Sequence, residues 1–178
     1  MTGCRTALLL TSFLLLSASQ TTATDTPAPI AHWTFDEPKS DRWPDLSGRG
    51  HDATAANPAN LRPSAGLLQG AVQFRGSHRL SVVNHQDFTD LKHVTFSVWV
   101  RPTGFDRYNE IFRKEDGNNR ILFSFQENGS ILSLGLNVGG YVECDAPIDP
   151  ALLLDGLWHH CAATFDGKTM RVYLDGRE

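Results

Sequence analysis

Residues 157–178 read LWHHCAATFDGKTMRVYLDGRE, and this stretch carries the strongest indication of the fold. Apolar and polar residues alternate in two short runs, 157–165 and 170–174, as is typical of half-buried strands. Asp166-Gly167 lies between the runs as a turn signal, so together they predict an antiparallel hairpin. Asp175-Gly176 is a second turn signal with only two residues after it. Because an unpaired edge strand is a liability, we expect a further strand that this chain lacks.

The same alternation recurs along the rest of the chain. Its clearest instance is VTFSVWV at 94–100, which places Phe96 and Val98 on one face of a strand and Trp99 on the other. Turn signals separate the runs, and Pro150 in DPALLLDG favours one helical turn. About ten short strands predict an all-β, antiparallel two-sheet sandwich or jelly roll with its C-terminal strand or strands missing. The other expected strands are 30–35, 71–74, 79–83, 110–114, 120–125, 131–137 and 141–145.

Length and composition indicate one globular domain. The chain has 178 residues, of which 40% are hydrophobic and 20% charged, and its net charge is -4. This balance excludes a disordered chain, and it lacks the basic stripe of a nucleic-acid-binding protein. We expect no nucleic-acid partner.

The N-terminus has the layout of an export signal. Arg5 precedes an apolar run, ALLLTSFLLL at 7–16, and small and polar residues follow, so cleavage is expected after Ser19 or Ala23. The run is shorter than the roughly 20 residues that span a membrane; the alternative is an uncleaved anchor. We assign 1–24 to a signal peptide and leader and 25–178 to one incomplete domain. The protein is expected to be secreted, with a periplasmic or cell-surface location as variants.

Export would expose the cysteines and one asparagine to conditions in which disulfides and glycosylation can form. Removal of the leader leaves Cys144 and Cys161, an even number in an oxidising compartment, so we expect a disulfide between them. The alternative is two buried free thiols. Asn128-Gly129-Ser130 is a glycosylation sequon, relevant only in a host that glycosylates secreted chains.

Several segments in order resemble a known family. AHWTFDE, DLSGRGHDAT, GLLQGAVQFRGS, VTFSVWVRPTGF and the opening stretch resemble the laminin G-like jelly-roll domain of the concanavalin A-like lectin/glucanase superfamily, over about residues 30 to 178. The resemblance implies two curved antiparallel sheets packed face to face. It also implies a further strand region, ending in an acidic segment, after the YLDG hairpin.

Catalysis is not expected. Glucanases of this superfamily need two carboxylates that face one cleft, and the pattern Glu-x-Asp-x-x-Glu is absent. Glu115 and Asp116 are adjacent, and Glu110 and Glu115 are five apart, so strand alternation would place each pair on opposite faces. We therefore predict that this chain is not an enzyme.

Calcium is the one cofactor that the resemblance implies. The candidate ligands are Asp36, Asp45, Asp116 and Asn118. The chain departs from the family where 75–78 reads RGSH instead of an acidic stretch, and the late acidic segment is absent. The alternative is that these side chains cap turns.

Large aromatic residues and histidines are interpreted as structural. Trp99 and Trp158 are expected to fill the core. His159 and His160 are adjacent on a strand, so they face opposite ways and are poorly placed to bind one metal ion.

These observations predict a secreted, non-catalytic recognition or adhesion module that binds carbohydrate or an extracellular protein. One alternative is an accessory domain at the N-terminus of a larger exported hydrolase, with the catalytic part beyond residue 178. A second is a structural spacer, which exposed aromatic residues would oppose because sugars stack on such rings.

Overall fold

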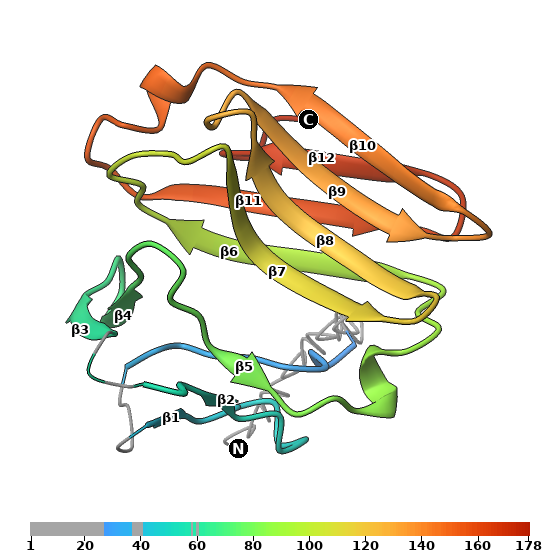
Figure 1. Cartoon of the computed structure of the whole chain (residues 1–178), viewed down its shortest axis with the longest axis horizontal. Coiled ribbons are helices and arrows are strands. Elements are labelled where there is room, and N and C mark those ends of the chain that lie inside the picture. The colour runs from blue at the N-terminus through green and yellow to red at the C-terminus, as the bar shows by residue number, and fades with distance from the viewer. Residues whose placement is uncertain (1–26, 37–40, 58, 60) are drawn as a thin grey trace, which may run out of the picture.

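The computed structural model describes residues 27–36, 41–57, 59 and 61–178, and its regular structure is almost entirely antiparallel strand (Figure 1). This confirms the predicted all-β class. The elements are β1 Arg42–Trp43, β2 Ala53–Thr54, β3 Arg62–Ala65, β4 Gly70–Gln73, β5 Ser81–Val82, η2 Gln86–Phe88, β6 Val94–Val100, β7 Tyr108–Asp116, β8 Asn119–Gln126, β9 Ile131–Asn137, β10 Tyr141–Pro147, η3 Pro150–Leu152, β11 His159–Phe165 and β12 Met170–Leu174.

Two sheets enclose the main core. One has the strand order β10-β9-β8-β7 and the other β12-β11-β6. Alternate residues of each strand point inward, so Phe123 of β8 and Leu134 of β9 pack against Cys161 and Ala163 of β11, all four fully buried. Burial of each large apolar side chain stabilises the fold by about 1.5–3 kcal/mol. The arrangement is a β-sandwich.

Tight turns set the register of the four-stranded sheet. β7 and β8 are joined at Gly117-Asn118, with Asp116 opposite Asn119. Gly117 has φ +57°, which a side-chain-bearing residue rarely adopts, and a hairpin turn of this length needs such a residue. This turn separates two of the expected strands, 110–114 and 120–125, as the turn residues Asp116-Gly117-Asn118-Asn119 favour.

The N-terminal third forms a smaller cluster beside the sandwich. Trp43, Ala53 and Leu61 are buried there, and Trp33 packs against them. The prediction of a strand at 30–35 is wrong: these residues join no sheet, and Phe35 has φ +62°, outside the strand region. The backbone of this segment is held instead by a side chain and a loop, since His32 N donates to Asp45 Oδ1 and His32 O accepts from Leu46 N.

β12 lies at the edge of its sheet. Among the described strands it pairs with β11 alone, and Arg177 turns back onto Leu174 through a short bridge. The expected signal peptide at 1–24 lies outside the described residues. None of the helices within 27–36, 41–57, 59 and 61–178 has the length and apolar character to cross a membrane.

Candidate functional site

An exposed tryptophan marks the outer face of the three-stranded sheet. Trp99 of β6 is 47% exposed, so the prediction that it fills the core is wrong. Its neighbours Val98 and Val100 face the core, and alternation turns Trp99 to the surface. Trp158 is partly buried and lies under the Arg101 guanidinium, 5.0 Å from the ring centroid.

Polar groups surround Trp99. Its cross-strand neighbour on β11 is His160, with ring centroids 5.1 Å apart. His160 Nε2 lies 2.8 Å from Ser97 Oγ, and its backbone N–H donates to Asp175 Oδ1 at 2.8 Å. A surface depression is lined by Trp99, His160, Asp175 and Gly176. An aromatic plate rimmed by a hydroxyl, an imidazole and a carboxylate is suited to a ligand with both apolar and polar faces.

A buried histidine holds the carboxylate of this depression in place. His159 Nδ1 lies 2.8 Å from Asp175 Oδ2, and His159 Nε2 lies 3.1 Å from Asp155 Oδ1. The hydrogen bond with Asp175, and a second with Asp155, raise the pKa of His159 despite its burial. Burial opposes ionisation of Asp175, but its bonds with His159 and the His160 amide lower its pKa overall. His159 and His160 face opposite ways, as predicted.

The face of the four-stranded sheet that turns away from the main core carries a polar row, in which the two central serines, Ser124 and Ser133, are buried. Glu110, Ser124, Ser133 and Asp145 lie directly opposite one another across β7, β8, β9 and β10. Ser133 Oγ donates to Asp145 Oδ1 at 2.6 Å. Glu143 lies on the same face as Asp145 and accepts from the Tyr141 hydroxyl at 2.7 Å. Strand alternation over 141–147 is the sequence signal that places Glu143 and Asp145 on one face, a pair that the predicted sites did not include.

Two other acids also share that face, contrary to the sequence analysis. A bulge between Glu110 and Phe112 shifts the alternation by one residue. As a result Glu110 and Glu115 both pair with Arg113. The Arg113 hydrogen bond lowers the pKa of Glu115, whereas a general acid needs a raised one.

The four calcium candidates have separate partners. Asp36 Oδ1 accepts from Gly70 N, and Asp116 Oδ2 accepts from Asn84. Asn118 lies in the β7–β8 turn. Asp45 accepts from three backbone N–H groups and the Ser47 hydroxyl. None of the four shares a hydrogen-bond partner with another, and calcium binding stays a prediction.

Asp45 is the hub of the segment DLSGRGHD. Burial opposes its ionisation, but the hydrogen bonds from the His32, Ser47 and His51 amides and from the Ser47 hydroxyl lower its pKa to about 2. Asp45 N in turn donates to Asp52 Oδ1 at 2.7 Å. The segment is thereby fixed by one buried carboxylate, as expected of an acid that caps a turn.

The two cysteines are free thiols, so the expected disulfide is not formed in the structure. Cys144 Sγ donates to Met170 O at 3.5 Å, whereas Cys161 lies opposite Leu174 at the other end of β12. Met170 and Leu174 are about 13 Å apart along β12. A disulfide needs Cα atoms within about 7 Å, so the two cysteines that neighbour these positions are too far apart to form one. Burial raises the pKa of Cys161 to about 12.

Asn128 lies exposed in the turn between β8 and β9, with φ +60°. The position is accessible to a modifying enzyme. Glycosylation there stays a prediction.

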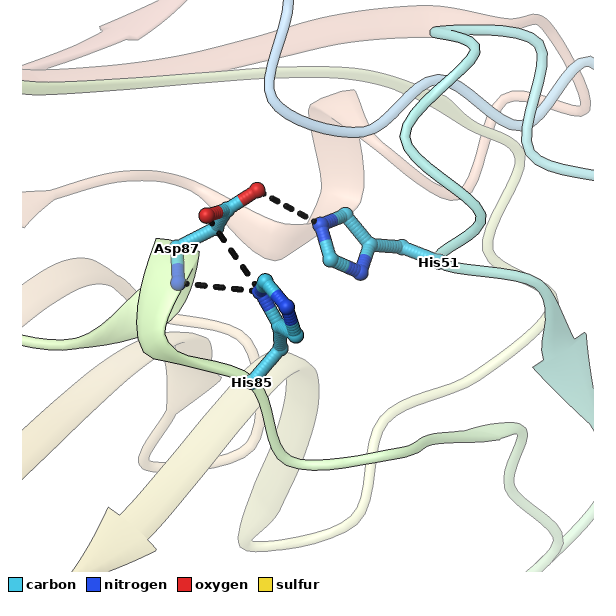
Figure 2. Close-up of side chains that lie close together, drawn as sticks. All are labelled: His51, His85 and Asp87. Atoms are coloured by element: carbon cyan, nitrogen blue, oxygen red, sulfur yellow. Dashed lines mark hydrogen bonds and ion pairs between the residues drawn. The ribbon is translucent and has the colours of Figure 1, made fainter.

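One group of metal-ligand side chains comes together among the described residues: His51, His85 and Asp87 (Figure 2). No local sequence pattern indicates this group, because His51 and His85 are far apart in the chain. The hydrogen bond from His51, with His85 and Arg49 adding to it, lowers the pKa of Asp87.

Comparisons with known proteins agree with the fold. A family model described as the concanavalin A-like lectin/glucanases superfamily, of laminin G type, matches residues 74–178. A crystal structure of an S-layer domain-containing protein from Clostridium thermocellum is similar, with a TM-score of 0.54 and 20% sequence identity, over 81% of this chain and 67% of that one. The curated proteins contain no match.

Proposed function

The chain belongs to the concanavalin A-like lectin/glucanases superfamily, and from that premise we propose that it is a non-catalytic recognition module that binds carbohydrate in the depression around Trp99. Laminin G-like domains bind carbohydrate or protein ligands. The single observation that carries the choice of carbohydrate is the half-exposed indole of Trp99 beside Ser97, His160 and Asp175.

The chemistry of the depression fits a sugar. A pyranose ring offers C–H groups on one face that stack on an aromatic plane, and hydroxyl groups at its edge. The Asp175 carboxylate and the His160 imidazole lie beside the indole to accept and donate hydrogen bonds. Leaving an indole half exposed forfeits apolar burial, which a ligand on its face would recover.

The acids near the depression support a binding role over a catalytic one. Asp175 is engaged by His159 and the His160 amide, and its pKa is lowered, which suits a permanent hydrogen-bond acceptor. The export signal expected at 1–24 supports a location outside the cytoplasm, where glycans are abundant. An extracellular or cell-surface location completes the proposal.

A glycan array probed with the purified chain tests the proposal. We expect the wild type to bind a defined set of glycans and Trp99→Ala to lose that binding. Tyr108→Ala is the matched control, because Tyr108 is a similarly exposed aromatic residue on the other sheet. A wild type that binds no glycan, or a Trp99→Ala variant that binds like the wild type, would overturn the proposal.

A further inference from the structure

We propose that His51, His85 and Asp87 form a binding site for a divalent transition-metal ion of the Zn²⁺ class, separate from the Trp99 depression. Figure 2 shows the two imidazoles directed at one carboxylate from two different segments. The proposal does not depend on carbohydrate binding.

The spacing of the three side chains matches a metal site. His51 Nε2 lies 3.0 Å from Asp87 Oδ2, and His85 Nδ1 lies 3.3 Å from Asp87 Oδ1. One ligand atom from each residue lies within 4.8 Å of the other two. Tetrahedral ligands at the usual Zn–N and Zn–O distances are about 3.3 Å apart. Small movements of the side chains would therefore let all three reach one ion.

The fold brings the two segments together. His51 lies in the loop before β2, two residues ahead of Ala53, and His85 follows β5; β2 and β5 pair with Ala53 opposite Val82. The His51 backbone is anchored on both sides, since its N–H donates to Asp45 Oδ2 and its carbonyl accepts from Trp33 Nε1. The backbone of His51, one of the three proposed ligands, is therefore held in place before an ion binds.

The imidazole rings of His51 and His85 differ in how far they are buried. The His51 side chain is 4% exposed and packs between His85 and Phe88, with ring centroids at 4.9 and 4.6 Å. The His85 side chain is 48% exposed, and its Nδ1 accepts from Asp87 N–H at 3.2 Å, a bond that an ion bound at Nδ1 would replace. His51 and His85, but not Asp87, also line a surface depression, from which an ion and a water molecule as fourth ligand can approach the two rings.

The ligand set selects the class of metal. Two imidazole nitrogens and one carboxylate suit Zn²⁺, Cu²⁺ or Ni²⁺, whereas Ca²⁺ prefers six or more oxygen ligands. Arg49 competes with the ion, because its guanidinium lies 3.4 Å from Asp87 Oδ2. Since Arg49 is about half exposed, its side chain can swing away when a cation binds.

Calorimetric titration of the chelator-treated, tag-free chain with Zn²⁺ tests the site, and the absorption spectrum with Co²⁺ reports the coordination. We expect one saturable equivalent. His85→Ala and Asp87→Asn should weaken binding by roughly tenfold or more, since even the partners of metal ligands matter by that much. Neither change removes a buried apolar group, and circular dichroism of both variants checks that they fold.

His93→Ala is the matched control, an exposed histidine outside the cluster, and should bind like the wild type. Arg49→Gln should bind Zn²⁺ more tightly, because it removes the competing charge. Absence of saturable binding, or His85→Ala and Asp87→Asn variants that bind like the wild type, would overturn the assignment. Weaker binding by Arg49→Gln would count against Asp87 as a ligand.

Discussion

His159 Nδ1 lies 2.8 Å from Asp175 Oδ2, which ties strand β11 to the turn after β12. Asp175 adopts φ +49° in this turn, a conformation that side-chain-bearing residues seldom take. Its other oxygen accepts from the His160 amide, and its own N–H donates to the His160 carbonyl at 2.8 Å. The turn is thus held by three bonds to β11, and the same carboxylate borders the depression at Trp99.

Asp175→Asn should lower the free energy of unfolding by about 1 kcal/mol, because the neutral amide cannot pair with the His159 imidazolium and the site is partly screened by solvent. Urea denaturation followed by circular dichroism measures the change. Asp106→Asn is the control, as Asp106 is exposed and only its backbone takes part in a described hydrogen bond. Equal stability of the Asp175→Asn variant and the wild type would contradict a stabilising role for the His159–Asp175 pair.

His159 with its two carboxylate partners, Asp155 and Asp175, is called the clamp here, and it predicts how stability depends on pH. The pKa of His159 is raised above its ordinary 6.5, so its stabilisation is complete below that value and is lost as pH rises through the folded pKa. The pKa values of Asp155 and Asp175 are lowered below 3.8, so their stabilisation is present above 3.8 and is lost as pH falls through their folded values.

We therefore expect the clamp to contribute most between pH 3.8 and 6.5 and less in alkaline solution. Urea midpoints measured from pH 3.8 to well above pH 6.5 should fall on the alkaline side in the wild type. In His159→Gln that fall should be smaller, because glutamine does not titrate. An unchanged pH profile in the variant would show that His159 is not responsible.

A buried carboxylate organises the N-terminal segment. Asp45→Asn should lower the free energy of unfolding by about 2 kcal/mol, since Asp45 accepts four hydrogen bonds and an amide oxygen replaces only part of them. Asp41→Asn is the neighbouring control at an exposed position. Thermal unfolding compares the two. A loss of stability in the Asp41→Asn variant as large as that in the Asp45→Asn variant would contradict a specific role for Asp45.

Both thiols of the sandwich should be free. In denaturant without reductant, Cys144 and Cys161 should both react with a thiol reagent. In the folded protein Cys161 should react far more slowly, because it is 0% exposed and burial raises its pKa to about 12. Peptide mapping identifies each modified residue. A disulfide-linked peptide containing both cysteines would contradict the structure.

Local pattern was sufficient for much of the sandwich. The strands at 94–100, 131–137 and 170–174 agree residue for residue with β6, β9 and β12, because their alternation and flanking turn signals are both encoded within a few residues. The helical turn predicted at Pro150 is η3. These elements depend on neighbours that are close in the sequence.

Other features depend on contacts that no local pattern reveals. Strand alternation placed Trp99 and Val98 on opposite faces of one strand. Only the assembled sheets show that no described residue covers the exposed part of the Trp99 ring. The bulge that brings Glu110 and Glu115 together breaks the period on which their prediction rested. The cluster of His51 with Asp87 joins residues 36 positions apart, and it follows from the pairing of two very short strands.

The environment of Trp99 during ligand binding tests the central claim most directly. The chain has four tryptophans, so a spectrum of indole N–H groups contains few signals, and Trp99→Phe identifies the one from Trp99. On titration with a glycan selected by the array, the account predicts that the Trp99 signal shifts in a saturable manner while that of buried Trp43 stays in place. An unchanged Trp99 signal under conditions where the glycan binds would contradict the account.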